Sequence, residues 1–286
     1  MIKETNHPKI SLILLTLIIL FYNPAFTQEK PNIIFIMADD LGYGDVGVYG
    51  QQLIKTPNID RLSAQGMRFS DYYSGAAVCA PARSVLMTGL HTGHTRIRGN
   101  FGKGGVVGLA GKQGRVPIKE EDLTIAEFLQ ENGYKTGMIG KWGLGEPNTS
   151  GEPNKKGFDY FYGFYNQRRA HSYYPDYIWE NTNKVKLHGN ENEQNHQYTH
   201  NLFADKSINF IDRNFEKPFF LYLPVCIPHS RYELPDNGIY THKAGWTDLQ
   251  KKYAAMVTRL DETVGRIIQR LNALGIADKT YIFFTS

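Results

Sequence analysis

Short apolar runs recur along the chain, and each is bounded by polar residues, glycine or proline. The clearest is Ile33-Ile34-Phe35-Ile36-Met37, which contains no polar position. A continuous run of this length is typical of a strand that is buried on both faces of a sheet. We expect strands at 31–38, 67–73, 135–139, 218–225 and 280–285.

Between these runs, apolar residues recur at helical spacing. The longest such segment, 246–274, places apolar residues on one shared face and is followed by Gly275, a residue type that commonly ends helices. Pro57 and Gly66 bound a shorter helix in the same way. We expect helices at 56–66, 81–88, 123–129, 202–215 and 246–274, and loops at 99–114, 145–163 and 181–197.

The expected strands and helices alternate along the chain. This order predicts an α/β fold, a three-layer α/β/α sandwich around a large, mostly parallel mixed sheet. In such sheets ligands bind beyond the carboxyl ends of the strands. Asp39-Asp40, Lys141 and His229 each follow an expected strand, so we expect them at one rim. No internal repeat or strong linker interrupts the chain, which favours one domain.

The N-terminus has the pattern of an export signal. Lys3 and Lys9 precede an apolar run of 13 residues, 10–22, whereas a membrane span takes about 20. Ala25-Phe26-Thr27 provides a small residue at each end of a cleavage site. We therefore expect a signal peptide at 1–27, a catalytic domain at 28–286, and a periplasmic or extracellular protein without a stable membrane anchor. An uncleaved anchor is the alternative interpretation.

The composition excludes some partners. The net charge of +4 is small, and no stripe of Lys and Arg follows any helical pattern, so we expect no nucleic-acid partner. Hydrophobic residues make up 41% of the chain, enough for a substantial core. The two cysteines, Cys79 and Cys226, would by default form one disulfide in an exported protein, but the sequence around Cys79 argues against simple pairing.

Asp39 and Asp40 are adjacent carboxylates at the end of a buried strand. Placing two such charges there is costly unless a cation neutralises them. Ca²⁺ and Mg²⁺ are hard cations that prefer oxygen ligands. The pair therefore indicates a divalent-metal site, and a solvated turn is the alternative.

Cys79 lies just before the helix expected at 81–88. The free N–H groups at a helix start favour anions, so a thiolate or an oxyanion would be stabilised there. Arg83, one turn further on, could reach back towards the same point. A buried cysteine beside a surface arginine is the alternative.

The residues around Cys79 resemble a family signature. The string Ala77-Val78-Cys79-Ala80-Pro81-Ala82-Arg83-Ser84-Val85-Leu86-Met87-Thr88-Gly89 is similar to the sulfatase signature along its whole length. The segment 133–142 resembles the second sulfatase signature, Asp39-Asp40 the first metal-binding stretch, and Pro228-His229 the downstream active-site histidine. The resemblance runs from about Pro31 to Ser286.

The resemblance implies an alkaline-phosphatase-like fold and a definite chemistry. In sulfatases the signature cysteine is oxidised to formylglycine by a separate maturation enzyme, and the hydrated aldehyde attacks the sulfur of a sulfate ester. A Ca²⁺ ion and cationic side chains hold the sulfate. The implied substrate is a sulfated small molecule or carbohydrate. By position, the implied catalytic residues are Cys79, Arg83, Lys141 and His229, and the implied metal site consists of Asp39, Asp40 and Cys79.

The sequence departs from the family at Gly143, where members commonly carry a histidine. His171, from another loop, is a candidate to supply the missing imidazole or to contact the substrate. Aromatic residues near His171 could stack on a sugar ring or could simply pack the loop. These residues are Tyr173, Tyr174, Tyr177 and Trp179.

The chain stops at Ser286, directly after the last expected strand. In sulfatases this strand leads into an Asp-Asn pair that completes the metal site, so the resemblance indicates a sequence that is truncated at its C-terminus. Two other functions stay open. One is a phosphodiester or phosphonate ester hydrolase of the same superfamily, and the other is an inactive fragment that binds glycans.

Overall fold

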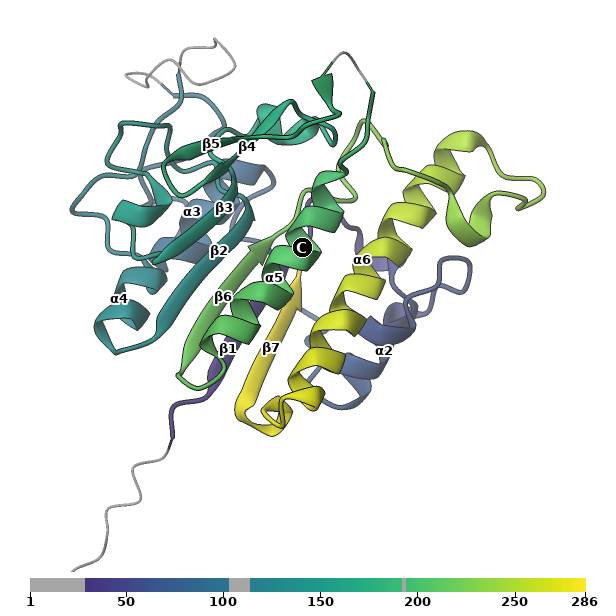
Figure 1. The fold of residues 1–286 in the computed structure, drawn as a ribbon, viewed down its shortest axis with the longest axis horizontal. Coiled ribbons are helices and arrows are strands. Elements are labelled where there is room, and N and C mark those ends of the chain that lie inside the picture. Colours follow the sequence, from purple (N-terminus) through teal and green to yellow (C-terminus); the bar gives the residue numbers. More distant parts are fainter. Residues whose placement is uncertain (1–28, 103–113, 192–193) are drawn as a thin grey trace, which may run out of the picture. The chain divides into compact units, whose positions relative to one another are not determined.

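The computed structural model describes residues 29–102, 114–191 and 194–286, and a sheet of seven strands forms its centre (Figure 1). The strand order is β5-β4-β3-β2-β6-β1-β7. The strands are β1 (Asn32–Met37), β2 (Lys135–Lys141), β3 (Tyr160–Phe164), β4 (Tyr177–Glu180), β5 (Asn183–Lys186), β6 (Phe219–Pro224) and β7 (Thr280–Thr285).

Five neighbouring strands pair in parallel, in the order β3-β2-β6-β1-β7. The two short strands β4 and β5 add an antiparallel edge. The expected architecture, a mostly parallel mixed sheet, is thereby confirmed. The hydrophobic run of β1 suits its place between β6 and β7, where Ile34 pairs with Leu221 on one side and Ile282 on the other.

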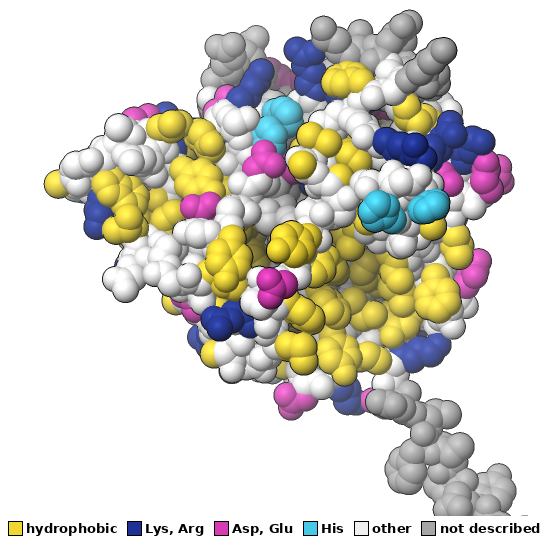
Figure 2. All heavy atoms as spheres, turned by 180° about the vertical axis from the view of Figure 1, so that it is seen from behind, with side chains coloured by type: hydrophobic (Ala, Val, Ile, Leu, Met, Phe, Trp, Pro, Cys, Tyr) yellow, Lys and Arg dark blue, Asp and Glu magenta, His cyan; other side chains and the backbone are white. Residues whose placement is uncertain are grey.

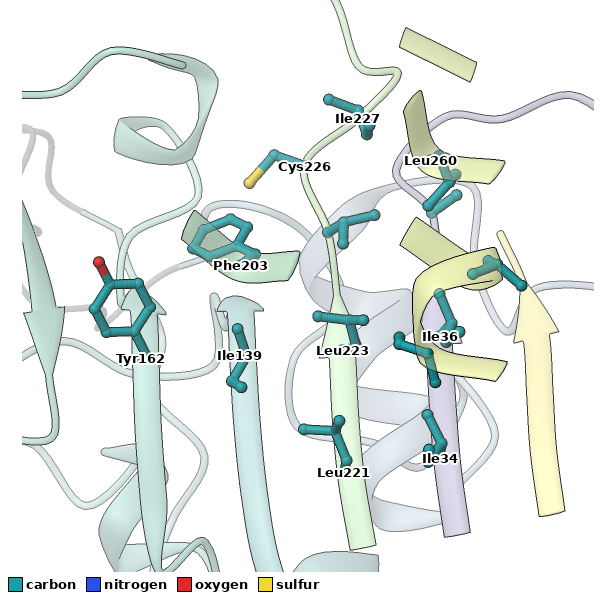
Figure 3. Close-up of a cluster of buried hydrophobic side chains, with 14 of the residues drawn as sticks. Ile34, Ile36, Ile139, Tyr162, Phe203, Leu221, Leu223, Cys226, Ile227 and Leu260 are labelled. Carbon is teal, nitrogen blue, oxygen red and sulfur yellow. The ribbon is translucent and has the colours of Figure 1, made fainter. Parts of the chain in front are cut away.

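Helices cover both faces of this sheet (Figure 1). Ile34 and Ile36 of β1 pack into one hydrophobic cluster with residues of α5 and α6, part of which Figure 3 shows around Leu223 and Phe203. Ile33 and Phe35, which alternate with them, pack against the cluster that includes residues of α3 and α4. The helices are α2 (Pro57–Ala64), α3 (Cys79–Thr88), α4 (Ile125–Glu131), α5 (Thr199–Asn214) and α6 (Asp248–Ala273).

Local signals in the sequence explain where these helices begin and end. Thr124 and Glu127 form a capping box at the start of α4, and Thr247 and Gln250 do the same for α6. Gly89 follows α3 with φ of 67°, a conformation that glycine adopts readily. These boundaries agree with the expected helices to within a few residues.

The strand expected at 67–73 does not form. Met67 and Tyr73 are 80% and 82% exposed, so this segment, in which polar and apolar residues are mixed, has no partner strand to bury it. The loops expected at 145–163 and 181–197 were also wrong in part, because they contain β3 and β5. β3 is rich in aromatic residues but directly follows a glycine- and proline-rich stretch, and β5 is a polar edge strand with a weak apolar signal.

Part of the sheet remains open on the face that carries α3 and α4. Figure 2 shows hydrophobic side chains gathered on this side of the molecule. On β7, Tyr281 and Phe283 are 61% and 46% exposed, and Phe283 stacks on Phe35 of β1. The alternate residues Ile282 and Phe284 pack against the opposite, helix-covered cluster. One face of β7 is therefore partly buried and the other presents aromatic rings.

The expected signal peptide lies outside the described residues. Within the described ranges, no helix is both long enough and apolar enough to span a bilayer. Residues Pro31–Ser286 form one compact unit, and the division at residue 28 stays a prediction.

Candidate active site

The carboxyl ends of three adjacent parallel strands, β1, β6 and β2, bring the predicted site residues together. Asp39 follows β1, Lys141 is the last residue of β2, and His229 follows β6. The carboxylate of Asp39, the sulfur of Cys79 and the imidazole of His229 all have ligand atoms within 4.8 Å of one another. The expectation of one common rim is met by these side chains.

Asp39 is a buried carboxylate held between two cations. Its Oδ2 accepts a hydrogen bond from Lys141 Nζ at 2.6 Å, and its Oδ1 accepts one from Arg83 Nη2 at 3.3 Å. Burial favours the neutral acid, but the charges of Lys141 and Arg83 outweigh it and lower the pKa of Asp39. The residue is therefore ionised at neutral pH.

Cys79 is the first residue of α3, at the positive end of the helix dipole. The sulfur lies 3.4 Å from Lys141 Nζ. Burial raises the pKa of the thiol, but a hydrogen bond with His229 and the charge of Lys141 lower it by more. The next N–H of the helix, that of Ala80, donates to Asn100 Oδ1 at 3.0 Å, so Asn100 caps the helix from a distant loop. The position favours an anion.

Arg83 lies one turn along α3 and is 1% exposed. Besides Asp39, its guanidinium binds the main-chain oxygen of Lys141, with Nη1 as the donor at 2.5 Å. Arg83 therefore fixes the end of β2 against the start of α3. The alternative of a surface arginine is wrong.

His229 lies between a carboxylate and a second imidazole. Its Nε2 is 3.3 Å from Asp40 Oδ2, and its ring stacks on that of His171 with centroids 4.1 Å apart. A hydrogen bond to Cys79 raises the pKa of His229, whereas burial lowers the pKa of His171 to about 4. His171 is therefore neutral at physiological pH, and its Nε2 is buried with no partner among the described residues.

The main chain around His229 is fixed by Tyr173. The hydroxyl of Tyr173 lies 2.8 Å from the oxygen of His229 and 3.1 Å from that of Cys226. Tyr173 is fully buried and Trp179 is 8% exposed, so these two aromatic residues pack the loop and do not offer an open face to a sugar. Sequence reasoning missed Tyr173 as a support of the site, because an aromatic cluster alone does not reveal such a bond.

Cys79 and Cys226 are both free. Cys226 is 2% exposed, and burial raises the pKa of its thiol to about 12. Figure 3 shows it beyond the end of β6, among apolar side chains. The two cysteines do not form the disulfide that would be the default in an exported protein, as the surroundings of Cys79 had indicated.

The residues present match part of a calcium site. Asp39 and Asp40 offer the oxygen ligands that Ca²⁺ prefers, but Cys79 and His229 offer sulfur and nitrogen. Ca²⁺ takes about 6–8 oxygens, and both oxygens of Asp39 already bind Lys141 and Arg83. The two carboxylates therefore suit a hard cation in kind, whereas the sulfur and the nitrogen do not, and the described donors supply only part of its coordination shell.

Comparison with known proteins agrees with these motifs. The sulfatase family model matches residues 31–286. The chain is 30% identical to N-acetylgalactosamine-6-sulfatase of Homo sapiens over 277 residues, which cover 90% of this chain and 50% of the relative. It is 34% identical to an arylsulfatase of Hemicentrotus pulcherrimus over 275 residues, which cover 90% of this chain and 47% of the relative.

Among solved structures, that of Ps i-CgsB in complex with k-i-k-neocarrahexaose has a TM-score of 0.76 at 32% identity. The match covers 90% of this chain and 58% of that chain. The chain spans about half the length of the curated relatives it matches. Because the family model extends over nearly all of the described fold, the chain belongs to the sulfatase family.

Proposed function

We propose that the protein is a sulfuric ester hydrolase that acts on sulfated carbohydrate through a nucleophile made from Cys79. The observation that carries the proposal is the contact of Cys79 with Lys141 at the start of α3, above the buried Arg83–Asp39 pair. The cations there and the positive end of the helix dipole suit a bound sulfate group and the negative charge that develops when it is transferred.

Each cationic residue has a distinct task. Lys141 is close enough to both Cys79 and Asp39 to hold a sulfate oxygen against the nucleophile. Arg83 is buried beneath the site and keeps α3 and β2 in register, so it steadies the nucleophile from behind. Positioning of this kind lowers the barrier because the reacting groups are held in place before reaction.

His229 would protonate the oxygen of the departing alcohol. The carboxylate of its exposed neighbour Asp40 lies 3.3 Å from Nε2 and favours the charged imidazolium. The largest cause of the raised pKa is the contact with the Cys79 sulfur, which conversion of Cys79 would remove. Asp40 and Asp39 would then be the charges that keep the imidazole protonated.

Two groups would complete the site. Formylglycine, formed from Cys79 by a maturation enzyme, supplies a hydroxyl nucleophile when it is hydrated. Ca²⁺, held in part by Asp39 and Asp40, supplies positive charge towards the sulfate. Lys141 and Arg83 would have to share Asp39 with such an ion.

Relatives support a sulfated sugar as the substrate. One is an N-acetylgalactosamine-6-sulfatase, and Ps i-CgsB is known in complex with k-i-k-neocarrahexaose. The N-terminal pattern of the sequence supports export to the periplasm or beyond, where such polysaccharides are found.

Mass spectrometry of the Cys79 peptide tests the proposal. The protein is expressed with a formylglycine-generating enzyme, and Cys79→Ser serves as the unconverted control. We expect the aldehyde in the wild type and release of sulfate from an aryl sulfate. Faster release from an aryl phosphodiester would instead identify a phosphodiesterase of the same superfamily. Glycan binding in calorimetry without any turnover would identify a binding protein, which the incomplete set of calcium ligands favours as the second candidate.

A further inference from the structure

Gly143 and Gln167 compete for the same volume beside the site. A Cβ atom placed on Gly143 would lie 1.8 Å from Nε2 and 2.4 Å from Cδ of Gln167. The φ angle of Gly143, 81°, is also one that side chains rarely adopt. A side chain at position 143 and the carboxamide of Gln167 therefore exclude one another.

The loop that carries Gln167 is fastened to the end of β2. The N–H of Gly143 donates to the oxygen of Tyr165 at 3.0 Å. The side-chain amide of Asn166, the residue after Tyr165, donates to the carboxylate of Glu146. These bonds hold the two residues that precede Gln167, so its side chain is placed over Gly143 by two separate attachments.

Gln167 is 3% exposed, and neither its Oε1 nor its Nε2 has a partner among the described residues. Gln167 and Arg115 line one small cavity. The Nε of Arg115 is also unpaired within the described residues. The cavity measures about 10 Å³, which is room for about one oxygen-sized group. Ala80, the neighbour of Cys79, forms another wall. A buried amide without partners is costly, so such a group commonly serves a ligand.

We propose that Gln167 is a further catalytic residue, an inference that rests on the proposed sulfatase function. Its carboxamide hydrogen-bonds a hydroxyl of the hydrated aldehyde formed from Cys79. The aldehyde gains one water to form this hydrate and loses the same water on reverting, so no oxidant or reductant takes part. A hydrogen bond to the hydroxyl shifts this equilibrium towards the hydrate and orients the attacking oxygen.

Reactivity of the aldehyde tests this role without using turnover. An aminooxy probe condenses with the free aldehyde and not with the hydrate. Gln167→Met keeps the volume of the side chain and removes its hydrogen bonds, so we expect oxime formation about two- to tenfold faster at equal conversion. Gln130→Met, which changes an exposed amide on α4, is the matched control and should react like the wild type.

Turnover provides the second measurement. For Gln167→Met we expect kcat to fall by about tenfold or more while KM for the aryl sulfate changes little. Unchanged oxime formation and unchanged kcat in a converted Gln167→Met protein would overturn the role of Gln167 alone. An unmodified Cys79 thiol in the wild type would overturn the proposed function, and the role of Gln167 with it.

A double-mutant cycle tests the shared volume. Gly143→Asn places a carboxamide on a residue type that tolerates positive φ, and Gln167→Gly removes the clash. We expect Gly143→Asn alone to lower the melting temperature, because the new side chain clashes with Gln167. In the double variant the clash is gone and the carboxamide at position 143 replaces the one removed at position 167. The melting temperature and kcat of the double variant should therefore both be higher than the sum of the two single changes gives. Strictly additive effects would show that the two positions do not compete and would overturn the inference.

Discussion

Lys141 and Asp39 form a buried ion pair, with Nζ 2.6 Å from Oδ2 and side chains that are 0% and 5% exposed. The two residues are 102 positions apart in sequence and lie at the ends of β2 and β1, two strands that are separated in the sheet by β6. Because Arg83 is the other partner of Asp39, two cations share one carboxylate. The remaining positive charge is available to an anionic substrate at the rim.

Lys141→Met should destabilise the protein by about 3–5 kcal/mol, because removing one partner of a buried pair leaves the other charge poorly compensated. Unfolding in urea measures the change. Lys135→Met is the matched control on the same strand. Lys135 is about half exposed, and its Nζ makes only a long ion pair with Asp159, at 4.0 Å from Oδ2. The control should change stability by less than about 0.5 kcal/mol. Equal losses in both variants would contradict the structural role of Lys141.

Stability should fall on acidification because of His200. This residue is 2% exposed, and burial lowers its pKa from 6.5 to about 3. Between these values the unfolded chain binds a proton that the folded protein does not, so the stability present above pH 6.5 is lost as the pH falls towards 3. The contribution is about 1.4 kcal/mol per pH unit in the steepest part of this window.

His200→Gln isolates that contribution. Nε2 of His200 lies 2.9 Å from Thr263 Oγ1. The Thr263 hydroxyl donates to the main-chain oxygen of Arg259, so it accepts from His200. A glutamine side-chain amide can donate to Thr263 in the same way. We expect the urea midpoint of the variant to depend less on pH between 6.5 and 4 than that of the wild type. Identical slopes would show that His200 is not the group responsible.

Tyr173→Phe should loosen the loop that carries His229. The change removes the hydroxyl that contacts the oxygens of Cys226 and His229, and it leaves those buried acceptors without this donor. A cost of about 1–3 kcal/mol follows, together with a fall in kcat. Tyr198→Phe is the control, because its buried hydroxyl has no partner among the described residues and its loss should be nearly neutral or stabilising.

Replacing Tyr281 and Phe283 together with lysine should reduce self-association of the chain. Both side chains are exposed on an edge strand, a combination that favours contact with a second molecule. Light scattering after size-exclusion chromatography measures the effect. Leu249→Lys, at another exposed apolar residue on α6, is the control. Self-association that persists in the double-lysine variant would locate the contact elsewhere.

The sequence determined the central strands, the main helices and the chemistry of the rim. Apolar runs identify β1, β6 and β7 because these strands are buried or half-buried, and capping residues and glycines mark the helix ends. Asp39, Cys79, Lys141 and His229 could be predicted because each lies at an element boundary within a specific motif.

Only the tertiary structure decided which weakly patterned segments join the sheet and how the site is supported. β5 is polar yet joins the sheet, whereas 67–73, which has four apolar or aromatic residues, stays exposed. Strand formation depends on a partner that local composition does not reveal. Contacts such as Tyr173 with His229, or Gln167 over Gly143, join loops far apart in the chain. Their residue types are ordinary, and only folding gives them a shared position.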